Sequence, residues 1–81
     1  MIKIIALHYR GNFEYELTFS DQTSGVFDGR LLLERTGPLL DVLREEKYFS
    51  RAFIDAGGLC WPNGLELSPS RLYEISVAEA A

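Results

Sequence analysis

The sequence predicts a single small domain of the α+β class, spanning residues 1–81, with helices on one face of a mostly antiparallel sheet. Three observations support this class. Residues 2–9 and 13–20 have strand composition and are joined by a link too short for a parallel crossover. The middle of the chain changes to leucines at helical spacing, and a second strand pair follows. This grouping predicts two layers in the order β-β-β-α-β-β-α.

The first hairpin has the clearest strand pattern. Residues 2–9 are rich in β-branched and aromatic types, and residues 13–20 alternate between apolar and polar side chains. Because only residues 10–12 separate them, the two strands must be antiparallel. The side chains that we expect to face the core from the second strand are Phe13, Tyr15, Leu17 and Phe19.

A third strand and two helical segments are expected next. A polar connection leads into a short strand at residues 25–28, which gives a three-stranded meander. Residues 30–35 contain three consecutive leucines and predict a short turn of helix. Gly37-Pro38 interrupts the pattern, and a helix from Pro38 to about Tyr48 follows, because proline is tolerated in a first helical turn.

The last third predicts a second hairpin. Residues 51–56 return to strand composition, Gly57-Gly58 allows a tight turn, and residues 59–61 form the partner strand. Pro62 ends the pairing because it lacks an N–H donor, and Asn63-Gly64 turns the chain. The expected core aromatics and leucine are Phe13, Tyr15, Leu17, Phe19, Phe53 and Trp61.

A short helix is expected at the C-terminal end. Ser68 has the character of an N-cap and Pro69 that of a first helical residue, so the helix extends to about Ser76. We expect residues 78–81 to fray. The chain is long enough for one small core and too short for a second domain.

Composition narrows the function classes. Twelve acidic against eight basic residues give a net charge of −4, which disfavours direct binding to nucleic acid. The apolar runs are far shorter than the roughly 20 residues that span a bilayer, so no membrane association is expected. A single cysteine excludes an intramolecular disulfide and, with no signal peptide, favours a cytoplasmic location.

No catalytic or metal-binding set of residues is recognisable. His8 has no acid, cysteine or second histidine at ligand spacing, and Cys60 has no activating base nearby in the sequence. We therefore expect a buried, inert thiol, no metal, no cofactor and no enzymatic activity.

Several short motifs carry a family resemblance. They are Phe19-x-Asp21, Tyr48-Phe49, Ile54-Asp55, Trp61-Pro62-Asn63-Gly64, Pro69 and Leu72-Tyr73-Glu74. In these the chain resembles, over nearly its whole length, the small bacterial family called domain of unknown function 2442. The resemblance implies a two-layer α+β fold similar to the N-terminal domain of certain helix-turn-helix regulators. It also implies a short, stand-alone protein, and some members are thought to be antitoxin partners of small neighbouring toxins.

The chain departs from the family pattern at three places, namely Gln22, Glu66 and Ser70. The last of these replaces an acidic residue before the final helix, which argues against any function that needs a carboxylate there. Because the sequence ends at Ala81, we expect no DNA-reading module of its own.

The segment Trp61-Pro62-Asn63-Gly64 has two compatible interpretations. In the structural one, Trp61 anchors the core and the next three residues end a strand and turn the chain. In the functional one, an exposed edge of Trp61 is surrounded by a polar recognition surface. The residues of this predicted surface are Asp55, Trp61, Asn63, Glu66 and Arg71.

Two functions follow as hypotheses. The first is a non-catalytic protein-interaction module of the antitoxin kind, in which the acidic domain docks on a basic toxin. The alternative is a small-molecule-sensing or regulatory domain, which would have a pocket near Trp61. An exposed sheet edge also makes a homodimer conceivable, because unpaired strands pair readily.

Overall fold

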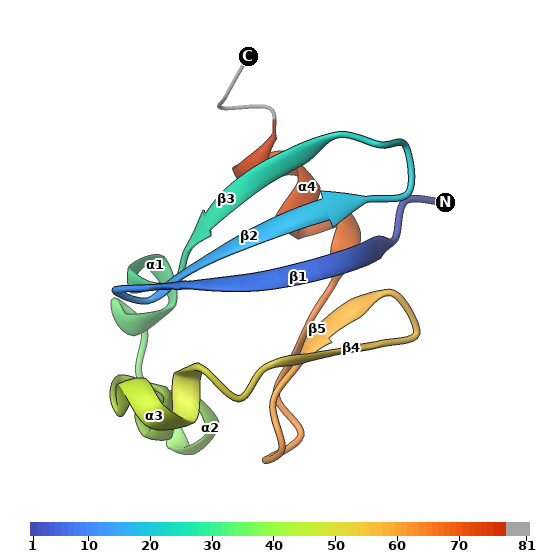
Figure 1. Cartoon of the computed structure of the whole chain (residues 1–81). Coiled ribbons are helices and arrows are strands. Elements are labelled where there is room, and N and C mark those ends of the chain that lie inside the picture. Colours follow the sequence, from blue (N-terminus) through green and yellow to red (C-terminus); the bar gives the residue numbers. More distant parts are fainter. Residues whose placement is uncertain (78–81) are drawn as a thin grey trace.

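The strands form two antiparallel sheets of three strands each in the computed structural model, which describes residues 1–77 (Figure 1). The first sheet, in the order β1-β2-β3, contains β1 (Ile4–Gly11), β2 (Glu14–Phe19) and β3 (Ser24–Asp28). The second, in the order β4-β5-β6, contains β4 (Phe53–Asp55), β5 (Gly58–Cys60) and β6 (Glu66–Leu67). The α+β class is confirmed, whereas β6 and the division into two sheets were not predicted.

The helices are short. They are α1 (Arg30–Leu33), α2 (Pro38–Asp41), the 3₁₀ turn η1 (Val42–Arg44), α3 (Glu46–Phe49) and α4 (Pro69–Ser76). The predicted continuous helix from Pro38 to Tyr48 is wrong, because Glu45 adopts an extended backbone (φ −80°, ψ 113°) between η1 and α3. Within residues 1–77 no helix has the length and apolar character needed to cross a bilayer.

The first sheet forms one layer, and the rest of the domain covers only one of its faces. Tyr15, Leu17 and Phe19 point from β2 into the core and are at most 1% exposed, as the alternation predicted. Glu16, which lies between them, is exposed. In Figure 1, α4 lies behind β2 and β3, while α2, α3 and the β4–β5 hairpin lie below β1. This places Phe49, Leu59, Trp61 and Leu72 in the same core.

Two expected core aromatics are placed differently. Phe53 was predicted to be buried, but its side chain is 44% exposed because it points away from the core side of β4. Phe13 was predicted to begin the second strand, but it lies in the turn between β1 and β2 and is half-buried.

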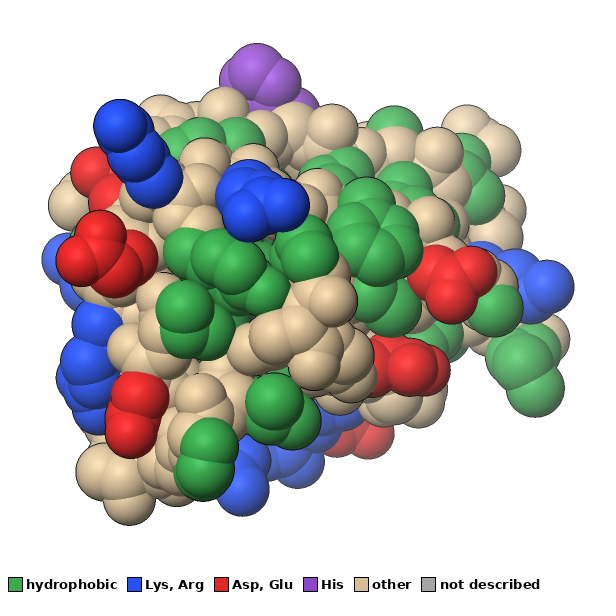
Figure 2. All heavy atoms as spheres, turned by 90° about the horizontal axis from the view of Figure 1, so that it is seen from below, with side chains coloured by type: hydrophobic (Ala, Val, Ile, Leu, Met, Phe, Trp, Pro, Cys, Tyr) green, Lys and Arg blue, Asp and Glu red, His purple; other side chains and the backbone are tan. Residues whose placement is uncertain are grey.

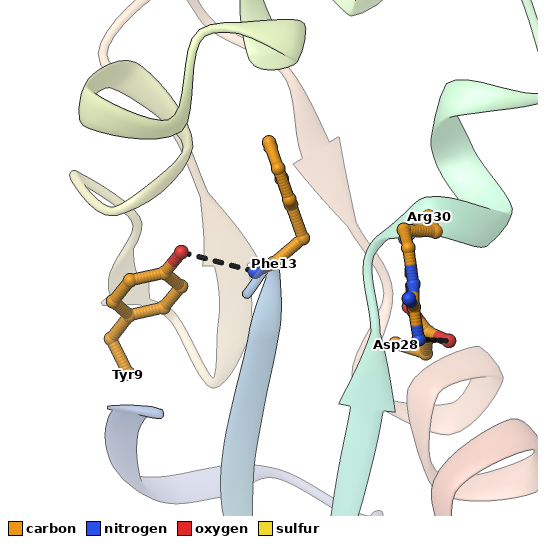
Figure 3. Close-up of polar contacts among 4 residues, drawn as sticks. All are labelled: Tyr9, Phe13, Asp28 and Arg30. Atoms are coloured by element: carbon orange, nitrogen blue, oxygen red, sulfur yellow. Dashed lines mark hydrogen bonds and ion pairs between the residues drawn. The ribbon is translucent and has the colours of Figure 1, made fainter. Parts of the chain in front are cut away.

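The turn of the first hairpin is hydrogen-bonded to the start of α3. Asn12 and Phe13 have positive φ angles (54° and 63°), as in a type I′ hairpin turn. The Tyr9 hydroxyl accepts a hydrogen bond from the Phe13 N–H at 3.1 Å (Figure 3) and donates one to the Glu46 carboxylate at 2.7 Å. The Asn12 N–H donates to the same carboxylate. The first residue of α3 is thereby held against the hairpin, next to the break at Glu45.

The second hairpin differs from the prediction by one residue. Ala56 and Gly57, with φ angles of 52° and 83°, form its turn, and Gly58 begins β5. The Ile4 N–H donates to the Gly57 carbonyl at 2.9 Å, which links the first strand of one sheet to the turn of the other. The strand before this turn is shorter than expected, because the Arg51 N–H continues the helical turn to the Tyr48 carbonyl.

The terminal helix begins as predicted. Ser68 is the N-cap, its hydroxyl accepts the Arg71 N–H at 3.2 Å, and Pro69 is the first helical residue. At the other end, α4 packs closely on β3, where a Cβ at Gly25 would lie 2.5 Å from the Ser76 carbonyl oxygen. The expected fraying of residues 78–81 lies outside the described residues.

Candidate functional site

Trp61 is part of the core and offers no exposed edge. Its side chain is 1% exposed, and its indole ring lies 5.5 Å from the ring of Phe49. The indole N–H donates to the Phe49 carbonyl at 2.9 Å, and the Tyr15 hydroxyl donates to the same oxygen. Such a carbonyl at the end of α3 has no partner within the helix. The expectation of an exposed edge on Trp61 is therefore wrong, and its polar atom is used inside the protein.

The three residues after Trp61 form the loop between β5 and β6. The Gly64 N–H donates to the Trp61 carbonyl at 3.0 Å, and the Trp61 N–H donates to the Leu65 carbonyl at 2.9 Å. Gly64 has a φ of 94°. This is the pattern of a three-residue hairpin loop, in which a type I turn is followed by a left-handed residue. The structural interpretation of the motif is supported.

Asn63 links this loop to a helix. Its side-chain oxygen accepts the Leu65 N–H, and its side-chain amide donates to the Leu39 carbonyl of α2, both at 3.0 Å. The side chain is half-buried. With both ends engaged, Asn63 has a structural role.

Asp55 and Glu66 lie on the outward face of the second sheet, together with Phe53. Phe53 pairs with Cys60, and Cys60 pairs with Glu66, so the three residues lie side by side across the strands. Asp55 is two residues beyond Phe53 and shares its face. We call the surface formed by Phe53, Asp55 and Glu66 around Cys60 the acidic aromatic face.

The electrostatics of this face are negative. Within residues 1–77 the only ion pair joins Asp28 and Arg30 (Figure 3), so neither Asp55 nor Glu66 has a basic partner there. Burial raises the pKa of the Cys60 thiol, and the two carboxylates raise it further. Cys60 is 6% exposed at the base of the face, so we expect its thiol to react slowly.

Arg71 lies elsewhere. Glu66 and Leu67 point to opposite faces of β6, and Arg71 contributes to a pocket of about 250 Å³ on the Leu67 side. The five residues of the predicted surface therefore do not form one site. Asp55 and Glu66 are brought together, while Trp61, Asn63 and Arg71 lie apart from them.

A second hollow lies beside η1 and α3. It measures about 410 Å³ and is lined by Val42, Glu45, Lys47, Tyr48 and Arg51. The Arg51 guanidinium lies 5.3 Å from the centre of the Tyr48 ring, in cation–π geometry. Figure 2 shows the molecule from below, with hydrophobic side chains gathered in the middle of that face and acidic and basic side chains around them. Trp61 lines neither hollow, so the sensing hypothesis loses its expected location.

The histidine and the cysteine lie on different sheets. His8 is exposed on β1 opposite Glu16, whereas Cys60 lies in β5. No group of three or more His, Cys, Asp or Glu side chains in the described part of the chain is arranged to hold a metal ion.

The sequence contained one signal for the acidic aromatic face. In Phe53-Ile54-Asp55, the parity that places Asp55 toward solvent also places Phe53 there, and Ile54 packs against the core. The preference of aromatic side chains for the core concealed this pattern. The glutamate belongs to the two-residue strand β6, which is too short to show any alternation.

Comparison with known proteins identifies the family of the chain. Neither the curated proteins nor the solved structures gave a match. The profile of the family described as "Protein of unknown function (DUF2442)" matches residues 4–78, which include every helix and strand of the structure. The chain therefore belongs to the DUF2442 family.

Proposed function

We propose that this domain is a non-catalytic protein-interaction module that docks a basic partner protein on its acidic aromatic face. The observation that carries the proposal is the position of Phe53. A 44% exposed aromatic residue that shares a sheet face with two carboxylates, neither with a basic partner in the described residues, has the composition of an interface anchor. A partner with lysine or arginine around an apolar pocket would complement it.

The size of the domain is compatible with such a complex. A standard interface of about 1,600 Å² buries about 800 Å² on each partner. This is roughly a sixth of the 4932 Å² surface of the chain. The net charge of −4 would also speed the encounter with a basic protein.

An antitoxin-like role is the specific form that we propose. A small toxin that acts on RNA carries a basic cleft, and an acidic domain docked over it would block access to the phosphate backbone. Such inhibition needs no chemistry from this chain. A bacterial origin, a cytoplasmic location and the absence of direct nucleic-acid binding are parts of the same proposal.

Co-expression with the product of the neighbouring gene tests this role. We expect the neighbour alone to arrest growth and the wild-type chain to restore it. Phe53→Ala should weaken binding about thirtyfold, as for the loss of an interface anchor. A neighbour that is harmless in every form, or a rescue unaffected by Phe53→Ala, would contradict the proposal.

Charge is tested with a matched pair of double variants. Asp55→Asn with Glu66→Gln removes two charges from the acidic aromatic face. Glu16→Gln with Glu74→Gln removes two from exposed positions on β2 and α4. We expect only the first pair to weaken binding, and its loss to shrink as salt is added. Equal losses of affinity in the two double variants would mean that the net charge of the domain, and not the acidic aromatic face, controls binding.

The second candidate is the small-molecule-sensing domain, which the pocket beside Arg71 favours. A thermal-shift screen with common metabolites tests it, and the absence of any stabilisation would argue against it. The homodimer stays a prediction. A solution mass equal to that of one chain at all concentrations would exclude it.

A further inference from the structure

We infer that the pocket between α1, β3, β6 and α4 binds a small monocarboxylate with an apolar body. The inference rests on the second candidate function and names its ligand class. The site is independent of the acidic aromatic face, because its residue from β6 points to the opposite side of that strand.

The apolar part of the pocket comes from four elements. Phe27 of β3 and Leu72 of α4 are at most 1% exposed and belong to the core cluster, so they form a fixed floor. Leu31 of α1 also lines the pocket, yet it is 50% exposed. An exposed leucine that lines a pocket is the kind of side chain that an apolar ligand would cover.

The charged part comes from two arginines. Arg35 and Arg71 both line the pocket, and both are exposed. Within residues 1–77 neither forms an ion pair, although the domain as a whole is acidic. The backbone carbonyl of Arg35 accepts a hydrogen bond from Arg44 at 3.2 Å, and the Arg71 N–H is held by the cap of α4. These bonds fix the main chain at the two arginines, and two guanidinium groups without an ion-pair partner in the described residues match a carboxylate.

The volume limits the size of the ligand. At about 250 Å³ the pocket lies just below the roughly 300 to 1,000 Å³ of sites for drug-sized molecules. A compact ligand with one anionic end fits this space, whereas a nucleotide does not. Octanoate is a suitable probe because it combines a carboxylate with a short apolar chain.

Titration of the full chain with octanoate, followed through the methyl signals of Leu31, Leu67, Leu72 and Ile75 by nuclear magnetic resonance, tests the site. We expect saturable shifts of these signals. Arg35→Met and Arg71→Met keep the apolar part of the side chain and remove the charge. Each should weaken the affinity for octanoate about tenfold. Arg10→Met, on β1, is the matched control and should have no effect.

Two further probes separate the contributions. Octylamine has the same chain with the opposite charge and should bind at least about tenfold more weakly than octanoate. Inorganic phosphate supplies an anion without an apolar body and should leave the methyl signals unchanged. The inference would be overturned if octanoate gave no saturable shifts or if octylamine bound with equal affinity. It would also be overturned if phosphate produced the same shifts or if the arginine variants bound octanoate with unchanged affinity. Failure here leaves the partner-docking experiment unaffected, because that one depends on Phe53.

Discussion

Individual side chains in this domain stabilise it mainly by linking separate elements. The Phe49 carbonyl accepts hydrogen bonds from Trp61 and Tyr15, and the Tyr15 hydroxyl also accepts the Ala52 N–H at 3.2 Å. The Phe49 carbonyl oxygen and the Tyr15 hydroxyl thus connect β2, the end of α3 and Trp61, which follows β5. Buried polar groups that are fully paired favour one arrangement of the core over others.

Tyr15→Phe tests this network. The variant leaves the Ala52 N–H without its partner, and we expect a loss of about 1 to 3 kcal/mol in the free energy of unfolding. Urea denaturation measures it. Tyr48→Phe is the control, because the Tyr48 hydroxyl forms no hydrogen bond within the described residues. An equal loss in both variants would refute the role of the network.

Tyr15 also predicts how the stability of the domain changes at alkaline pH. Burial raises the pKa of Tyr15 to about 12 from an ordinary 10.0. Because the folded pKa is the higher one, its stabilising effect is complete below pH 10 and is lost as the pH rises toward about 12. Denaturant midpoints measured over this range should fall less steeply in Tyr15→Phe than in wild type.

Asn63→Ala separates a structural loop from a docking site. The substitution removes the partners of the Leu65 N–H and the Leu39 carbonyl. We expect a loss of about 1 to 2 kcal/mol in stability, with unchanged affinity for a protein partner when the folded fraction is taken into account. Unchanged stability together with weaker binding would return Asn63 to the interaction surface.

At the scale of elements, close approach decides how α4 lies on the first sheet. Gly25→Ala places a Cβ 2.5 Å from the Ser76 carbonyl oxygen, so helix and strand must separate. We expect a loss of about 1 to 3 kcal/mol, as for an overpacked core. The neighbouring exposed position supplies the control, Ser24→Ala, which should change thermal stability little. Equal melting temperatures for wild type and Gly25→Ala would contradict this packing.

A surface carboxylate also holds α4. Asp21 accepts the Tyr73 hydroxyl at 2.7 Å and both the hydroxyl and the N–H of Thr23, and these hydrogen bonds lower its pKa. Since the folded pKa lies below the ordinary 3.8, the stabilisation is present above that value and is lost as the pH falls through the folded pKa. Denaturation from about pH 5 to about pH 2 should show a flatter acid limb for Asp21→Asn. A limb identical to wild type would contradict the link.

At the scale of the whole molecule, the two sheets share one core, and Cys60 reports on its opening. Its burial and its raised thiol pKa both slow reaction with a thiol reagent. We expect modification in native buffer to be at least about a hundredfold slower than in denaturant. Rapid reaction of the folded chain would show that the second sheet opens independently.

Elements with a clear local signal could be predicted from the sequence. The β1–β2 hairpin follows from alternation, α4 from its Ser68-Pro69 start, and the loop after Trp61 from Asn63-Gly64. Of the predicted surface, Asp55 and Glu66 share a face in the structure. The predicted grouping of polar residues around an exposed Trp61 was wrong. The sequence of a strand does not show which of its two faces the rest of the domain covers.

The sequence by itself determined the α+β class, the family and the order of the main strands and helices, since periodicity, caps and turn residues act over a few residues. Only the tertiary structure decided that the strands divide into two sheets, that the middle helix breaks at Glu45, and that Trp61 is buried while Phe53 is exposed. Each of these features depends on residues that are distant in the chain. Glu46 accepts a hydrogen bond from Tyr9 of the first hairpin, and the Phe49 carbonyl accepts one from the Trp61 indole. Packing of this kind leaves no local pattern in the sequence.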